Sequence, residues 1–183
     1  MKQKIVLISL ILVIGIFELY VFNEMIFPKV SNHYKLYYID KKLISWSHGK
    51  GIFYSKGIEL NHKNIKRFLS REGWSGAEKT FRWNNGKIAS IFFEVTKDVS
   101  YTGKLNLNFG THKKQKIIIY LNNQKIAHET FNTNDINVTF LFNPKILKVN
   151  DINIIKLEFP NAQKPNNLDS RILAMSLKAL SIE

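Results

Sequence analysis

The chain contains no cysteine among its 183 residues, and this absence excludes two classes of exported protein. A lipoprotein needs a cysteine to carry its lipid, so a lipid-anchored protein is excluded. A disulfide framework is excluded as well. Any folded domain in this chain must therefore be held together by packing and hydrogen bonds alone.

Alanine is absent before Ala77, which bears on the apolar run Ile5–Phe22 near the start of the chain. Cleavage of a secretory signal needs small residues of the A-x-A kind, and the end of this run, Val21-Phe22-Asn23, is bulky. As a helix the run measures about 27 Å, close to the ~30 Å hydrocarbon core of a bilayer. We therefore predict an uncleaved membrane anchor over residues 1–27.

The charges around this run predict its orientation. Lys2 and Lys4 precede it and favour the cytoplasm, which places the chain after Phe22 on the extracytoplasmic side, periplasmic or cell-surface. A cleaved signal is the alternative, because only Ile5–Phe17 is free of charge and Glu18 interrupts the remainder of the run.

No block of five or more like charges occurs, although the net charge is +13. A basic surface of this kind attracts polyanions. Beyond a membrane, the expected partners are anionic lipid headgroups and acidic envelope glycans or glycolipids. No nucleic-acid-binding motif is present, so no nucleic acid partner is expected. A basic surface that is merely solvated is the alternative interpretation.

Motifs for catalysis and metal binding are also missing. The five histidines are scattered without metal-ligand spacing, and Asp135, Asp151 and Asp169 are isolated. No G-x-S-x-G nucleophile motif is present. We therefore predict no catalytic residues, no metal, no cofactor and no enzyme activity.

Period-two alternation of apolar residues recurs along the chain and predicts β-strands. In the strand Leu105–Phe109 the apolar residues form one face, while Asn106 and Asn108 point the other way. Asn122-Asn123 predicts a hairpin turn, because asparagine tolerates positive φ. The predicted strands are Ala89–Val95, Leu105–Phe109, Lys116–Leu121, Ile126–Phe131, Ile136–Phe142, Ile155–Phe159 and Ile172–Ile182, the last with a bulge near Lys178.

This pattern predicts an all-β fold, an antiparallel, jelly-roll-like β-sandwich over residues 57–183 that comes after one N-terminal transmembrane helix. Residues 28–56 read as a basic aromatic connector. They either hold short strands or lie on the membrane surface, where Tyr and Trp are favoured.

Two short motifs flank the predicted sandwich. Gly73-Trp74-Ser75-Gly76-Ala77-Glu78 and Phe81-Arg82-Trp83 open it, and Asp169-Ser170-Arg171-Ile172-Leu173-Ala174 precedes its last strand. The pair resembles the β-sandwich domain at the C-terminal end of bacterial membrane-bound glycosyltransferases and phosphoglycerol transferases, over roughly Ile65–Glu183. The resemblance implies this fold, an association with envelope glycan or glycolipid assembly, and a membrane transferase as partner.

The sequence also departs from that family. Lys79-Thr80 stands where the family has a tryptophan-containing step, and Ala174 stands where glycine is common. The family's catalytic machinery lies in a multi-span domain that these 183 residues do not contain. We therefore expect the fold to carry over and the catalytic activity not to.

The motif residues form the candidate ligand site. Tryptophans are platforms for sugar rings, and arginines bind carboxylates, phosphates or uronic acids. The charged members are expected to meet if the first and last strands are neighbours. The alternative is structural, with core tryptophans and ion pairs that fix a turn. The candidates are Trp74, Glu78, Arg82, Trp83, Asp169 and Arg171.

These features support two functional hypotheses. The first is a non-catalytic, envelope-associated accessory module that binds carbohydrate or supports a glycan or phosphoglycerol transferase at the membrane. The second is a basic structural protein that docks on anionic lipid or on a partner membrane protein. Salt dependence separates them, because screening weakens purely electrostatic binding while stacking on tryptophan persists.

Overall fold

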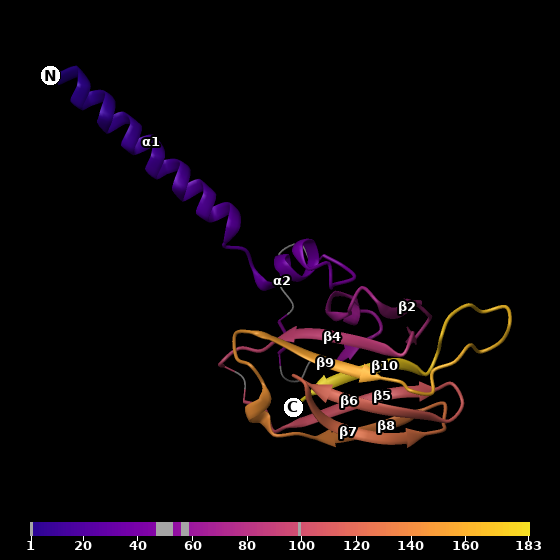
Figure 1. Cartoon of the computed structure of the whole chain (residues 1–183). Coiled ribbons are helices and arrows are strands. Elements are labelled where there is room, and N and C mark those ends of the chain that lie inside the picture. The colour runs from indigo at the N-terminus through magenta and orange to yellow at the C-terminus, as the bar shows by residue number, and fades with distance from the viewer. Residues whose placement is uncertain (1, 47–52, 56–58, 99) are drawn as a thin grey trace. The chain divides into compact units, whose positions relative to one another are not determined.

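The computed structural model describes residues 2–46, 53–55, 59–98 and 100–183 (Figure 1). The chain divides into two compact units, Met1–Ser31 and Asn32–Glu183. In the first unit, α1 covers Lys2–Ile26. Its segment Lys4–Ile26 is the one helix in the described part of the chain that is long and apolar enough to span a membrane. The predicted apolar N-terminal helix is thus confirmed. A signal sequence has the same length and apolar composition, so membrane anchoring and orientation stay predictions.

The second unit is an antiparallel β-sandwich. One sheet has the strand order β4-β9-β6-β7, and the other has the order β2-β3-β10-β5-β8 with β1 also paired to β10 (Figure 1). Every pairing between these strands is antiparallel. The strands are β1 (Leu60–Asn61), β2 (Gly73–Ala77), β3 (Arg82–Asn85), β4 (Ile88–Glu94), β5 (Lys104–Thr111), β6 (Gln115–Leu121), β7 (Gln124–Phe131), β8 (Ile136–Leu141), β9 (Ile152–Glu158) and β10 (Met175–Ile182). The predicted all-β sandwich is confirmed.

The core lies between the two sheets and conforms to the period-two pattern. In β5, Leu105, Leu107 and Phe109 are buried, and in β9 of the other sheet Ile155 and Leu157 are buried. Each side chain of this size contributes about 1.5–3 kcal/mol when it leaves water. Apolar burial of this kind stabilises the fold in a chain that has no disulfide.

The predicted turn and bulge are confirmed. Asn122 and Asn123 have φ of 49° and 68°, the left-handed geometry of a two-residue hairpin between β6 and β7. In β10 the register to β5 shifts between Leu177 and Ala179, which places the bulge at Lys178. A bulge re-aims the side chain it contains.

The described part of the predicted connector packs on the sandwich. It contains α2 (Asn32–Tyr34) and the π-helical turn η1 (Lys35–Ile39), and its residues Leu36, Leu43 and Tyr54 are buried. The Tyr54 hydroxyl accepts a hydrogen bond from the backbone N–H of Ile182 at 2.9 Å. Leu43 and Phe53 form single bridges to neighbouring segments, with Ser70 and Glu94 respectively. The predicted boundary between residues 56 and 57 lies outside the described residues.

Short helical turns complete the unit. η2 (Ile65–Phe68) precedes β2 and buries Ile65 and Phe68, and η3 (Pro144–Ile146) comes after β8. At η3 the side chain of Asn143 accepts a hydrogen bond from the backbone N–H of Lys145. The strand predicted to stop at Asn143-Pro144 ends slightly earlier, because β8 ends at Leu141 and η3 begins at Pro144.

Candidate functional site

Three of the predicted charged residues meet in one ion cluster. The Arg171 guanidinium donates to the Asp169 carboxylate at 2.7 Å and to Glu78 Oε1 at 3.1 Å. Glu78 comes after β2, and Arg171 precedes β10, so the cluster joins segments distant in the sequence. The hydrogen bonds from Arg171 lower the pKa of Asp169 to about 2, and the two carboxylates raise the pKa of Arg171. The three side chains are a quarter to two fifths exposed, so a ligand can reach the cluster.

Arg82 stays apart from this cluster. It is buried, and its Nη1 donates to the backbone carbonyl of Ser75 at 2.7 Å. Burial lowers its pKa. Among the described residues no carboxylate lies within ion-pair distance of its guanidinium. In this structure Arg82 is oriented toward the interior and joins β3 to β2 at Ser75, where the register between the two strands shifts.

The two tryptophans of the motif lie in different environments. Trp74 is buried, and its indole N–H donates to the backbone carbonyl of Ser90 at 3.0 Å, which links β2 to the other sheet. Trp83 is only half-buried. Phe81 and His112 pack against it at nearly right angles, with ring centroids 5.8 Å and 6.5 Å away. Of the two indoles, only that of Trp83 is in a position to contact a ligand without rearrangement of the core.

Trp83 lies at one end of a polar surface on the outer side of the six-stranded sheet. Strand register places Trp83 opposite Ser176 of β10, and Ser176 opposite Gly110 of β5. A hollow of about 300 Å³ lies over these three residues. A Cβ on Gly110 would come within 2.5 Å of the Asn134 carbonyl and 2.9 Å of Ser176 Oγ. Glycine at this position therefore keeps the floor of the hollow open.

A second hollow of about 230 Å³ lies farther along the same strands, over Asn106, Asn108, Thr139 and Ser181. Asn106 accepts from the Thr139 hydroxyl at 2.7 Å and donates to Ser181 Oγ at 3.1 Å. The Oδ1 atom of Asn108 is buried and has no hydrogen-bond partner among the described residues. Buried amide oxygens normally have a partner, so Asn108 Oδ1 is an unsatisfied acceptor beneath this hollow.

One lysine supplies positive charge at the hollow beside Trp83. Lys178 sits at the bulge of β10, and its Nζ is 2.9 Å from Asp135 Oδ1. An acidic ligand would compete with Asp135 for this ammonium group. We call the set the outer polar face: Trp83, Asn106, Asn108, Gly110, Thr139, Ser176, Lys178 and Ser181.

His112 borders this face beside Trp83. Burial, with a smaller effect from the nearby Lys113, lowers the pKa of His112. Its imidazole is therefore neutral at neutral pH and packs on the indole as an uncharged ring. No group of three or more potential metal ligands occurs among the described residues.

The outer polar face was only partly visible in the sequence. The period-two pattern places Asn106 and Asn108 opposite the apolar side of their strand, and the same parity applies to Thr139. The sequence does not reveal that β3, β10, β5 and β8 are neighbours in one sheet, because the strand order depends on the topology of the fold. Trp83 is the one predicted site residue on this face.

Comparison with known proteins gives matches at the level of structure alone. No family model and no curated protein matches the chain. Among solved structures, an acetyl xylan esterase from Butyrivibrio proteoclasticus is 12% identical with a TM-score of 0.46, covering 70% of this chain and 32% of the esterase. The chain thus spans about a third of that enzyme's length.

Two isolated modules also match. A family 6 carbohydrate-binding module is 9% identical with a TM-score of 0.44, over 73% of this chain and 98% of the module. A family 36 carbohydrate-binding module in complex with calcium and xylotriose is 10% identical with a TM-score of 0.42, over 69% of this chain and 99% of the module. These values carry no inference about family or ligand, and the fold assignment rests on the strand pairing of the two sheets.

Proposed function

We propose that the chain is a non-catalytic module that binds carbohydrate on its outer polar face. The observation that carries the proposal is the combination of the half-buried Trp83 with hydroxyl and amide side chains over two adjoining hollows. Sugars present hydroxyl groups that donate and accept, which Asn, Ser and Thr match. They also present apolar ring faces, which pack on aromatic side chains.

The ligand we propose is an acidic or phosphorylated glycan. Lys178 lies among the polar groups and has only a partly exposed surface pair with Asp135, which an anionic ligand replaces at small cost. The net charge of +13 attracts such a polymer to the module before it binds.

We further propose that α1 anchors this module in the membrane with the sandwich on the extracytoplasmic side, where it assists glycan or phosphoglycerol transfer. The lysines before the apolar helix and the resemblance of the flanking motifs support this. Labelling of a cysteine introduced at the exposed His128 tests the orientation. A membrane-impermeant maleimide is expected to label it in intact cells, and labelling only after lysis would overturn the orientation.

The binding test uses the full chain in nanodiscs, because sugar-based detergents would compete for the site. The probes are neutral, uronic-acid-containing and phosphorylated bacterial glycans, titrated by calorimetry at low salt and at ~0.5 M salt, where the screening length falls to a few Å. Saturable binding of one glycan that persists in high salt is expected. Binding to every polyanion that disappears with salt, or no binding, would sink the proposal.

Two variants locate the site. Trp83→Ala is expected to weaken glycan binding at least about tenfold, equivalent to ~1.4 kcal/mol. The matched control is Tyr120→Ala, which removes a half-buried ring from the outer side of the other sheet. Equal losses in both variants would show that the outer polar face is not the binding site.

A further inference from the structure

A second surface of the sandwich unit combines exposed aromatic rings with positive charge. Tyr34, Tyr38 and Ile39, from α2 and η1, are 39%, 49% and 50% exposed. Together with their neighbours, these residues form what we call the aromatic-basic surface: Tyr34, Tyr38, Ile39, Lys41, Lys42, Trp46 and Arg71. Exposed rings beside cations are not needed for the carbohydrate site, since none of these residues lines it.

The rings of this surface hold one another in place. Tyr38 lies 4.7 Å from Tyr34 and 5.2 Å from Trp46 between ring centroids. His33, which is buried, stacks on Trp46 at 4.7 Å with an interplanar angle of 5°. Leu36 stands between Tyr34 and Tyr38 in the sequence and is buried in the core. The aromatic-basic surface is therefore a fixed part of the sandwich unit.

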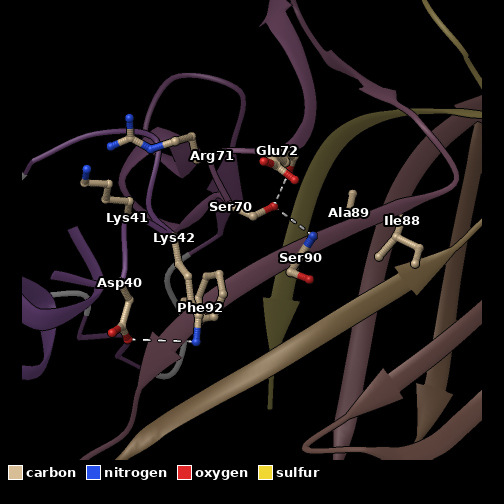
Figure 2. A pocket seen from close by; sticks show the side chains of 10 residues that line it. All are labelled: Asp40, Lys41, Lys42, Ser70, Arg71, Glu72, Ile88, Ala89, Ser90 and Phe92. Atoms are coloured by element: carbon tan, nitrogen blue, oxygen red, sulfur yellow. Dashed lines mark hydrogen bonds and ion pairs between the residues drawn. The ribbon is translucent and has the colours of Figure 1, made fainter. Parts of the chain in front are cut away.

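The basic residues of this surface line a hollow with a volume of about 430 Å³, whose wall residues are drawn in Figure 2. Three cations line it against two carboxylates, an excess of one positive charge. Lys42 Nζ is 3.8 Å from Asp40 Oδ2, whereas the side chains of Lys41 and Arg71 both point away from Phe92 in Figure 2. The residues on its walls that carry charge are Asp40, Lys41, Lys42, Arg71 and Glu72.

The backbone fixes this group of cations. The Arg71 N–H donates to the carbonyl of Lys42 at 2.6 Å, which joins the two charged segments. The Arg71 guanidinium lies 5.7 Å from the ring of Tyr37, so it connects the hollow to the aromatic cluster. Lys41 has a φ of 54°, a conformation uncommon for lysine. Backbone in such a conformation occurs often at ligand sites.

We propose that the aromatic-basic surface lies in the headgroup layer of an anionic membrane and that Lys41 and Arg71 bind a phospholipid phosphate. Tyr and Trp are favoured at membrane interfaces, and basic clusters bind anionic headgroups. A phosphate accepts two parallel hydrogen bonds from one guanidinium, and Arg71 presents that fork. A free anion would use the cations but leave the exposed Tyr38 and Ile39 without a role. Tyr34 also comes only eight residues after Ile26, the end of the apolar helix.

The absence of cysteine makes a depth measurement direct, because one introduced cysteine is the only thiol. Tyr38→Cys in the full chain is labelled with an environment-sensitive fluorophore. The protein is placed in phosphatidylcholine nanodiscs and in nanodiscs that also contain phosphatidylglycerol. We expect a blue-shifted emission that nitroxide-bearing lipids quench, both stronger with phosphatidylglycerol. Ile39→Cys repeats the test without removing a ring, and His128→Cys on β7 is the control that should show neither effect.

A charge variant tests the headgroup contact itself. Lys41→Gln with Arg71→Gln, added to the Ile39→Cys chain, is expected to abolish the difference between the two nanodisc types while the far-UV circular dichroism stays unchanged. Inorganic phosphate, added to phosphatidylcholine nanodiscs, is expected to leave the emission unaltered. Equal emission at Ile39 and His128, a response unchanged in the charge variant, or a response to free phosphate alone would each overturn the proposal.

Discussion

Trp74 and Trp83 stand nine positions apart in one short motif and end on opposite sides of the six-stranded sheet. Trp74 pairs with Asn84, the neighbour of Trp83 in β3, so the two indoles point in opposite directions. One indole is buried with its N–H bonded to Ser90, and the other borders a hollow. The same residue type therefore stabilises the core at one position and is available to a ligand at the other.

Replacement of the two tryptophans should separate these roles most strongly. Trp74→Ala removes a buried indole and its hydrogen bond, so we expect the free energy of unfolding to fall by about 3–5 kcal/mol. Trp83→Ala is expected to cost no more than about 1–2 kcal/mol. Urea unfolding monitored by circular dichroism measures both. Equal costs would mean that the inner and outer sides of the sheet do not differ in burial.

Filling the outer hollow is the next largest change. Gly110→Ala places a Cβ 2.5 Å from the Asn134 carbonyl and 2.9 Å from Ser176 Oγ, and we expect a loss of about 1–3 kcal/mol from overpacking. Glycan binding should weaken as well, because the hollow beside Trp83 is reduced. Gly76→Ala is the control, since a Cβ there meets nothing within 4 Å. Thermal unfolding with and without glycan distinguishes the two positions.

The smallest expected effect lies at the ion cluster. The depressed pKa of Asp169 means that its carboxylate favours the folded state above its ordinary pKa of 3.8, and this contribution disappears as the pH falls toward about 2. Asp169→Asn should therefore lower Tm slightly at neutral pH and bring the two proteins together near pH 2. A difference in Tm that is the same throughout this range would contradict the assignment. The effect is small because the cluster is exposed.

The sequence predicted the strands where one face is apolar. Leu105, Leu107 and Phe109 alternate with polar residues, and the asparagine pair after β6 forms the expected hairpin. β2 and β3 carry little alternation of apolar and polar residues. In addition, the register between them shifts between Trp74 and Ala77, and this register decides whether Trp74 and Trp83 lie on the same side of the sheet or on opposite sides. For that reason the positions of the two tryptophans relative to the sheet were beyond sequence reasoning.

The ion cluster shows the same limit. The motifs at the two ends of the domain led to the expectation that four charges meet, and Glu78, Asp169 and Arg171 do. Arg82 alternates to the inner side of β3, where it binds a backbone carbonyl. The ligand roles of all six candidate residues stay predictions, because the strand pairing locates them without revealing what they bind.

The strand that comes last in the sandwich occupies the middle of its sheet. β10 pairs with β3 on one side and with β5 on the other, and it also receives β1. During synthesis the flanking strands therefore leave the ribosome before Met175–Ile182, the strand that joins them. Until then β3 and β5 present unpaired backbone edges, which are templates for association with other chains. We therefore expect a nascent chain stalled before Met175 to aggregate more readily than the complete sandwich, in which β10 covers both edges.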